Sequence, residues 1–148
     1  FSRIMSLKDG LKKMSKSELS DLSRINLTDE KDQIINKIKK AKTDPMPMPD
    51  NIDELNKRPE AKNLLGIYSS LSRSPLEKCI KEFSGKNFSD FKENLSQVVV
   101  EKIIPISEEI KKLLKEKGYL DKILSDGCAK AHDIASKKMK KIHEIVGF

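Results

Sequence analysis

The sequence predicts an all-α fold in which amphipathic helices pack as a bundle. Apolar residues recur at helical spacing in five successive segments, and no strand alternation interrupts them. Several of these segments open on residues that favour helix starts, such as Ser, Thr and Pro. The 148 residues suffice for one domain with a core, or for a small domain with part of another.

The first 27 residues differ from this helical pattern. Arg3–Leu7 reads as a short strand, and Lys8–Gly10 breaks the pattern in a turn. Polar residues then dominate from Lys12 to Asp21 without a helical or strand period. We expect an exposed, mobile loop there.

The first helix is expected to begin at Thr28, a candidate N-cap that is followed by two acidic residues. Its apolar face consists of Ile34, Ile35, Ile38 and Ala41. The proline-rich segment Asp44–Asp50 cannot be helical, because each proline removes a donor and restricts the residue before it. It is predicted to be an extended linker.

Two helices are expected next. The first follows Arg58-Pro59, and its apolar stripe contains Ala61, Leu64, Leu65, Tyr68 and Leu71. The second begins at Ser74, with Pro75 at the first helical position, and ends near Gly85. Its apolar stripe contains Leu76, Cys79, Ile80 and Phe83.

The last two predicted helices are long. One is capped by Ser89 and carries an apolar stripe from Phe91 to Leu114, and Pro105 is expected to kink it. The other runs from about Leu120 to Val146.

Composition sets broad limits on function. Thirty Lys and Arg against 23 Asp and Glu give a net charge of +7, which fits a polyanionic partner or an ordinary basic surface. Cys79 and Cys128 form neither a disulfide framework nor a Cys-x-x-Cys half-site, so we expect reduced core cysteines in a cytoplasmic protein. No signal peptide or membrane-spanning run is visible. The chain also lacks an initiator Met and is expected to be part of a longer protein.

The pentapeptide Lys13-Met14-Ser15-Lys16-Ser17 is the segment most suggestive of chemistry. Two ammonium groups three residues apart on a flexible loop can close over a polyphosphate and neutralise charge on a leaving group. The same composition also suits a solvated loop without a function.

This pentapeptide is identical to the second signature of the class I aminoacyl-tRNA synthetases. The chain resembles their tryptophanyl branch, of bacterial type, in five further segments. These are Arg3–Asp9, Ala41–Asp44, Asn63–Tyr68, Asp126–Ala131 and Ile145–Phe148. The resemblance implies that residues 1–27 are the last strand and signature loop of a Rossmann-like catalytic domain that is otherwise absent, and that residues 28–148 form a helical domain binding the anticodon end of tRNA.

The resemblance also implies a reaction and roles for individual residues. Family members activate L-tryptophan with Mg²⁺-ATP and transfer it to tRNA(Trp). Lys13 and Lys16 correspond to the catalytic lysines that hold the β- and γ-phosphates. The loop residues Met14, Ser15 and Ser17 and the strand residue Ile4 complete the expected nucleotide contacts, and no residue of the chain is expected to be a dedicated Mg²⁺ ligand.

Parts of the family pattern are missing from the chain. The first signature, a His-x-Gly-His type element, is absent, as is the tryptophan pocket, so the chain alone is predicted to be inactive. His132 and His143 lie on the last helix and are expected to be at its surface or at the edge of the core. Some relatives hold an iron–sulfur cluster with four cysteines, which Cys79 and Cys128 cannot supply, so no metal site is expected.

Two lysine clusters leave their role open. The lysines between Lys137 and Lys141 either line the tRNA path or form a solvated helix face with Met139 and Ile142 turned inward. The same alternatives apply to Lys37, Lys39, Lys40 and Lys42. Other readings of the chain are a tyrosyl-type synthetase fragment and a non-catalytic helical RNA-binding module. A homodimer is expected for the full-length enzyme, and apolar surface near Phe1–Leu11 could pair with another copy.

Overall fold

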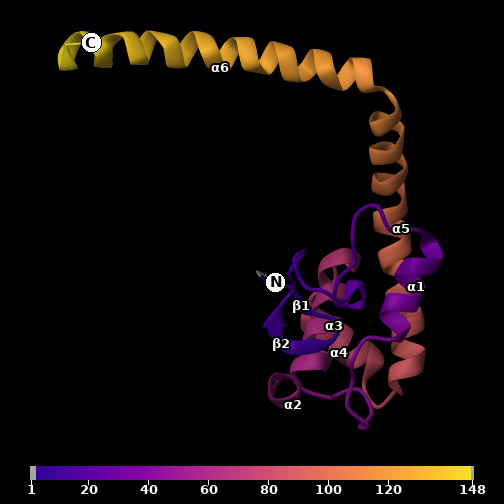
Figure 1. Cartoon of the computed structure of the whole chain (residues 1–148). Helices are drawn as coiled ribbons and strands as arrows, with labels where there is room; N and C mark the ends of the chain where they lie inside the picture. The colour runs from indigo at the N-terminus through magenta and orange to yellow at the C-terminus, as the bar shows by residue number, and fades with distance from the viewer. Residues whose placement is uncertain (1–2, 148) are drawn as a thin grey trace. The chain divides into compact units, whose positions relative to one another are not determined.

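The computed structural model describes residues 3–147, so Phe1, Ser2 and Phe148 lie outside the described residues. Six α-helices and one small sheet make up the regular structure of residues 3–147 (Figure 1). The elements in order are β1 Met5–Ser6, β2 Asp9–Lys13, the 3-10 turn η1 Asp21–Ser23, α1 Lys31–Lys39, α2 Ile52–Lys57, α3 Pro59–Ser72, α4 Leu76–Phe83, α5 Phe88–Lys115 and α6 Lys117–Val146. The predicted mostly helical architecture is therefore confirmed.

The described chain divides into two compact units, one that ends at Glu108 and one that begins at Glu109. The first unit contains a single apolar core, to which α1, α3, α4 and α5 all contribute. Most residues of the predicted stripes lie in this core. Those that are buried are Ile34, Ile38, Ala41, Ala61, Leu64, Leu65, Tyr68, Cys79, Ile80, Phe83, Phe91, Leu95 and Val99.

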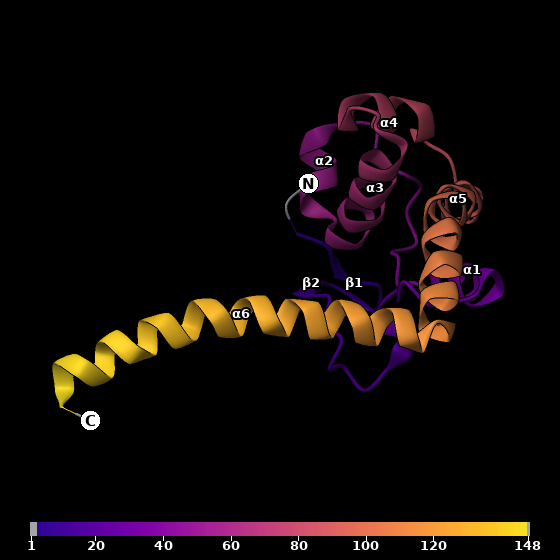
Figure 2. The same cartoon turned by 90° about the horizontal axis from the view of Figure 1, so that it is seen from above.

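An aromatic cluster joins α3, α4 and α5 within this core. Figure 2 shows α3 and α4 side by side. The Phe83 ring lies 4.9 Å from the Tyr68 ring and 4.9 Å from the Phe91 ring, both in edge-on geometry. Edge-to-face packing is the arrangement that aromatic quadrupoles favour. The cluster therefore fixes the mutual positions of these three helices.

The N-terminal hairpin is bound tightly to α3. β1 pairs antiparallel with β2. The side chain of Asn63, buried on α3, accepts a hydrogen bond from Met5 N–H and donates one to the Met5 carbonyl, both at 2.9 Å. Gly10 in β2 lies against the start of α3, where an added Cβ would come within 2.6 Å of the Pro59 carbonyl carbon. Only glycine allows this close approach of two backbones.

The proline-rich segment is irregular, as predicted, but it is packed against its surroundings. Met48 is buried, its N–H donates to the carbonyl of Lys86, and its carbonyl accepts from Gly85. Further along, Arg58 binds Asp44 through two of its nitrogens, at 2.9 and 2.6 Å. These contacts hold the segment against the turn between α4 and α5 and against the junction of α2 with α3.

Three details of the structure differ from the sequence predictions. β2 extends to Lys13, inside a stretch that was expected to be loop, because pairing with β1 supplies hydrogen bonds that a single-sequence pattern does not reveal. The short helix α2 was not predicted, and Asn51 caps it by accepting from Glu54 N–H. Helix starts are also shifted from the predicted caps Thr28, Ser74 and Ser89, with α1, α4 and α5 beginning at Lys31, Leu76 and Phe88.

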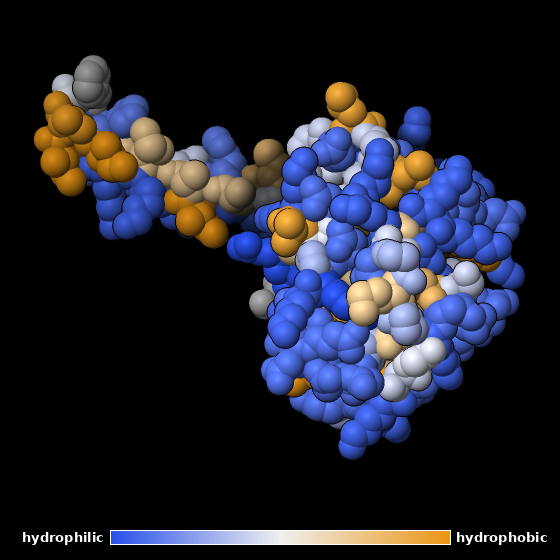
Figure 3. All heavy atoms as spheres, turned by 90° about the horizontal axis from the view of Figure 1, so that it is seen from below, coloured by the Kyte–Doolittle hydropathy of each residue, from blue (hydrophilic) through white to orange (hydrophobic). Residues whose placement is uncertain are grey.

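The second unit consists of the end of α5 and all of α6. No residue of α6 is buried, and the apolar side chains exposed on it include Leu124, Ile134, Ile142 and Ile145. Figure 3 shows apolar side chains, in orange, on this exposed helix. Cys128 is exposed, so the prediction of two core cysteines holds only for Cys79. None of the described helices is long and apolar enough to cross a membrane.

Candidate functional site

The loop that carries the sequence-predicted site begins where β2 ends. Lys13 is the last residue of β2 and pairs with Met5 across the hairpin. One residue further, the Met14 N–H donates to the Ile4 carbonyl at 3.1 Å. The structure therefore brings Ile4 and Met14, both predicted nucleotide contacts, side by side and fixes the incoming end of the loop.

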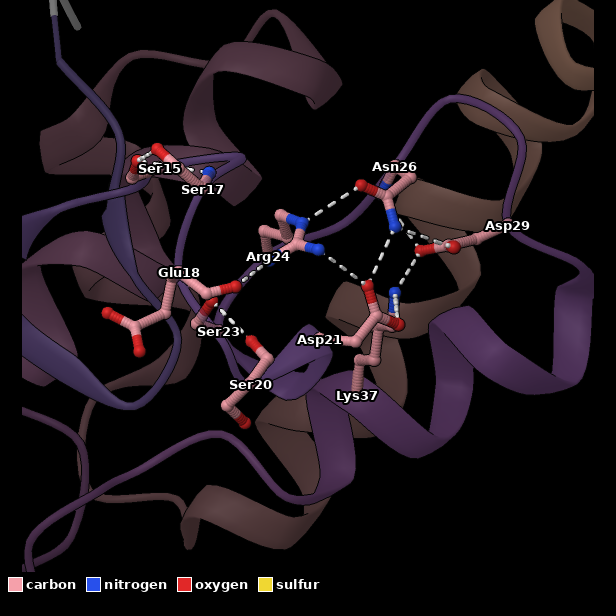
Figure 4. Close-up of polar contacts among 10 residues, drawn as sticks. All are labelled: Ser15, Ser17, Glu18, Ser20, Asp21, Ser23, Arg24, Asn26, Asp29 and Lys37. Carbon is pink, nitrogen blue, oxygen red and sulfur yellow. Dashed lines mark hydrogen bonds and ion pairs between the residues drawn. The ribbon is translucent and has the colours of Figure 1, made fainter.

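The centre of the loop has only local contacts (Figure 4). The hydroxyls of Ser15 and Ser17 lie 3.1 Å apart, and Ser17 N–H donates to the Ser15 hydroxyl at 3.3 Å. Lys13 and Lys16 are exposed, and neither has an acidic partner among residues 3–147. Both ammonium groups are thus available to an external anion.

The outgoing end of the loop is held by a network of charged side chains (Figure 4). Arg24 donates to the Glu18 carbonyl at 2.8 Å and lies 3.2 Å from an Asp21 carboxylate oxygen. The other Asp21 oxygen lies 2.7 Å from Lys37 Nζ, which also binds Asp29 at 2.6 Å. The hydrogen bond from Lys37 holds the pKa of Asp21 below its usual value. The carboxylate therefore stays ionised near neutral pH.

Lys37 corrects one of the sequence readings. It was grouped with Lys39, Lys40 and Lys42 as a basic residue that faces either RNA or solvent. Its side chain is only 4% exposed and is enclosed by two carboxylates. The burial of a lysine is tolerated because both carboxylates compensate its charge, so Lys37 cannot bind RNA. Lys42 pairs with Glu60 at 2.9 Å, which raises the Lys42 pKa.

The spacing of Lys37 contained a signal that the sequence reading did not use. It lies three residues after Ile34 and four before Ala41, which places it on the apolar face of α1. A lysine at such a position needs carboxylate partners. No sequence signal identified Asp21 and Asp29 as those partners, since they come from a segment without regular periodicity.

An apolar hollow of about 280 Å³ lies beside the loop. Ile4 and Met14 form part of its wall, and helices α3 and α5 contribute most of the rest. The remaining lining residues are Ile25, Leu27, Ile67, Ser70, Leu71, Val99 and Ile103. The hollow thus adjoins the two predicted nucleotide contacts, whereas both loop lysines lie outside its lining.

The remaining predicted residues lie on α6. The four lysines from Lys137 to Lys141 are exposed, and Lys137 forms a 2.8 Å pair with Asp133. Met139 and Ile142 are 49% and 47% exposed, so the alternative in which they turn inward is not observed. His132 and His143 are exposed, as a surface position predicts. Within the described part of the chain, no group of three or more His, Cys, Asp or Glu residues could hold a metal ion.

The arrangement suits one kind of chemistry. Two cations sit on a short loop whose ends are both fixed to packed structure and whose centre has only local hydrogen bonds. The centre of such a loop can bring its two ammonium groups onto a polyphosphate while the ends of the loop stay fixed to the core.

Comparison with known proteins gives an independent view of the chain. A model of the family "tRNA synthetases class I (W and Y)" matches residues 1–103. A tryptophan–tRNA ligase of Brucella melitensis is 49% identical over 146 residues, which cover 99% of this chain and 41% of that protein. The chain therefore spans less than half the length of this curated relative.

Solved structures agree with the sequence comparison. The tryptophanyl-tRNA synthetase of Mycoplasma pneumoniae is 28% identical with a TM-score of 0.61, and the match covers 74% of this chain and 35% of that one. The Campylobacter jejuni enzyme, complexed with ADP and tryptophan, has a TM-score of 0.75 at 24% identity, covering 99% of this chain and 44% of that one. The second similarity concerns the fold alone.

Proposed function

We propose, since the chain belongs to the class I tRNA synthetases of the tryptophan and tyrosine type, that it is the C-terminal part of a tryptophan–tRNA ligase. The observation that carries the proposal is the 49% identity to a tryptophan–tRNA ligase over 99% of the chain. The full-length protein would activate L-tryptophan with ATP and transfer it to tRNA(Trp). The tryptophan pocket would lie in the part of the protein outside this chain.

The loop from Lys13 to Ser17 would serve the activation step. The tryptophan carboxylate attacks the α-phosphate of ATP, a new acyl–phosphate bond forms, and pyrophosphate leaves with its electron pair. Lys13 and Lys16 would hold the β- and γ-phosphates and stabilise the charge that develops on the leaving group. Their exposure and their lack of acidic partners within residues 3–147 support this role.

The neighbouring residues would position the nucleotide. Met14 would contact the adenine, and Ile4 would lie beside the same nucleotide, which the 3.1 Å hydrogen bond between their backbones supports. Ser15 and Ser17 would shape the loop through their mutual hydrogen bond. Mg²⁺ would arrive with ATP, where it neutralises phosphate charge, without ligands from this chain.

The helical residues would bind the anticodon end of tRNA(Trp). The net charge of +7 supports a polyanionic partner, and the lysines of α6 are exposed. The full-length enzyme would act in the cytoplasm as a homodimer.

Amino-acid-dependent exchange of pyrophosphate into ATP tests the proposal in the full-length protein. Exchange that requires tryptophan supports it, exchange that requires tyrosine assigns the chain to the tyrosyl branch, and no exchange with either overturns it. Lys13→Ala and Lys16→Ala should each raise the barrier by about 3 kcal/mol, with little change in tryptophan affinity.

A matched control is available on the adjacent strand. Lys12 is exposed and already paired with Asp9 at 3.7 Å, so Lys12→Ala should leave the exchange rate nearly unchanged. Equal losses in all three variants would mean that general charge, and not the loop signature, supports the reaction.

A further inference from the structure

The two ends of the 13–17 loop are attached in different ways. Strand pairing holds the incoming end, with Met14 N–H donating to Ile4. In the outgoing segment, Glu18 N–H bonds Ser15 and Arg24 N–H bonds Asp21, while the Ser23 carbonyl accepts from Leu7 N–H in the hairpin at 2.9 Å. The backbone thus ties this segment to the hairpin, whereas side-chain contacts tie it to α1.

Two lines of polar contacts make this attachment. The longer one passes from Arg24 Nε to the Asn26 side chain at 3.2 Å and on through Asp29 to Lys37. The shorter one is the more direct. It runs from the Glu18 carbonyl to Arg24, from Arg24 to Asp21, and from Asp21 to Lys37 on α1, with distances of 2.8, 3.2 and 2.7 Å (Figure 4). It begins one residue after Ser17. A displacement of Asp21 would therefore be transmitted directly to the end of the loop.

The buried end of this line is rigid and electrically balanced. Asp29 is 5% exposed and is the second carboxylate that binds the Lys37 ammonium group. The Asn26 side chain donates to both Asp21 and Asp29, at 3.0 and 3.2 Å. Two cations, Arg24 and Lys37, thus face two carboxylates. Since its charges are matched, the network supplies no free positive charge to a phosphate, unlike Lys13 and Lys16.

We propose that Asp21, Arg24 and Lys37 are positioning residues for the phosphate-binding loop. They keep the outgoing end at a fixed place on α1, so that movement of the loop is confined to its centre and brings the lysines onto the leaving group in one geometry. This inference rests on the proposed function. It assigns a catalytic consequence to residues that touch no substrate.

Asp21 is the best position for a test. Its side chain is 55% exposed, and Asp21→Ala removes the direct link between Lys37 and Arg24. The buried pair of Lys37 with Asp29 and the longer path through Asn26 remain. Asp32, an exposed carboxylate in the first turn of α1, offers the matched control Asp32→Ala. Asp32→Ala should keep the melting temperature of the parent to within about 2 °C, because surface substitutions rarely cost more. Asp21→Ala should lower it, because the buried Lys37 then keeps only one carboxylate, so activity is measured well below both melting temperatures.

Two measurements are needed. In the full-length protein, Asp21→Ala should lower kcat of tryptophan-dependent pyrophosphate exchange about 10- to 100-fold, since misplacing a catalytic group has effects of that size. The KM for tryptophan should stay within about twofold, because the network is remote from tryptophan binding. In the 148-residue chain, amide hydrogen exchange at Ser23 and Arg24 should be about tenfold faster, with α3 unchanged.

Each remaining outcome counts against the inference. An unchanged kcat, with or without faster hydrogen exchange, would show that the network is only structural. A lower kcat without faster exchange at Ser23 and Arg24 would show that Asp21 does not act by positioning. If the unmodified full-length protein exchanges no pyrophosphate, the proposed function fails, whereas hydrogen exchange still decides whether Asp21 anchors the loop.

Discussion

Helices α3 and α6 both carry apolar side chains at helical spacing but have opposite environments. In α3, Ala61 and every residue from Asn63 to Tyr68 are buried. Helix α6 is about twice as long as α3, yet none of its residues is buried. The difference shows that an apolar stripe predicts a helix and the face to be covered, but not the surface that covers it. Residues in the two regions should therefore respond very differently to equivalent substitutions.

The largest effect is expected in the aromatic cluster that α3 shares with α4 and α5. Phe91 is fully buried against Phe83, so Phe91→Ala should lower the free energy of unfolding by about 3–5 kcal/mol. Ile134 on α6 is 68% exposed, and Ile134→Ala should cost no more than about 0.5 kcal/mol. Urea denaturation followed by circular dichroism measures both. Equal losses would mean that α6 is packed in solution.

Two glycines give the next comparison. At Gly10, an added Cβ would meet the backbone of Pro59 at 2.6 Å, so Gly10→Ala should destabilise the protein by about 1–3 kcal/mol. At Gly127, within α6, the same Cβ meets nothing within 4 Å. Because alanine is the better helix former, Gly127→Ala should stabilise that helix by about 0.5–1 kcal/mol. Helicity and thermal melting should separate the two variants by sign.

Acid sensitivity distinguishes a packed ion pair from an exposed one. Burial raises the pKa of Asp44, but hydrogen bonds from Arg58 and from Met46 N–H outweigh this and hold it below the usual 3.8. Since the folded pKa is the lower one, the stabilisation is complete above about pH 4 and is lost as pH falls further. Asp44→Asn should cost about 1–3 kcal/mol at neutral pH and reduce this acid dependence.

The control for this pair lies on α6. Asp133 and Lys137 are both exposed, so Asp133→Asn should change stability by less than about 0.5 kcal/mol. Unfolding free energies between pH 2 and pH 7 test both variants. An acid dependence unaltered by Asp44→Asn would assign it to other carboxylates.

The exposed lysines of α6 should have the smallest effect on stability. Charge reversal at Lys137, Lys138, Lys140 and Lys141 should leave the fold intact, yet weaken tRNA binding if these residues contact phosphates. Each lost contact should reduce the log–log salt slope by roughly 0.7–0.9. Unchanged affinity and slope would make this face a solvated surface and place the RNA path elsewhere.

The sequence alone determined the helical class and most of the core, and it located the loop for which a chemical role is proposed. The stripes predicted for α1, α3, α4 and α5 contain most of the buried apolar residues from Ile34 to Val99, because helical periodicity is a local property. Met48, Leu55, Ile67 and Phe88 were not among them. Lys13–Ser17 was found because its residues are contiguous in the sequence. The assignments of Lys13, Lys16, Ile4 and the rest of the loop to a nucleotide remain predictions.

Only the tertiary structure decided which residues support that loop. The strand β2, the fit of Gly10 against Pro59 and the partners of Lys37 all depend on contacts between segments that are distant in the chain. Lys37 illustrates the reason. Its position in the sequence specifies a helix face, but whether that face meets solvent, RNA or two carboxylates depends on where the segment from Asp21 to Asp29 folds.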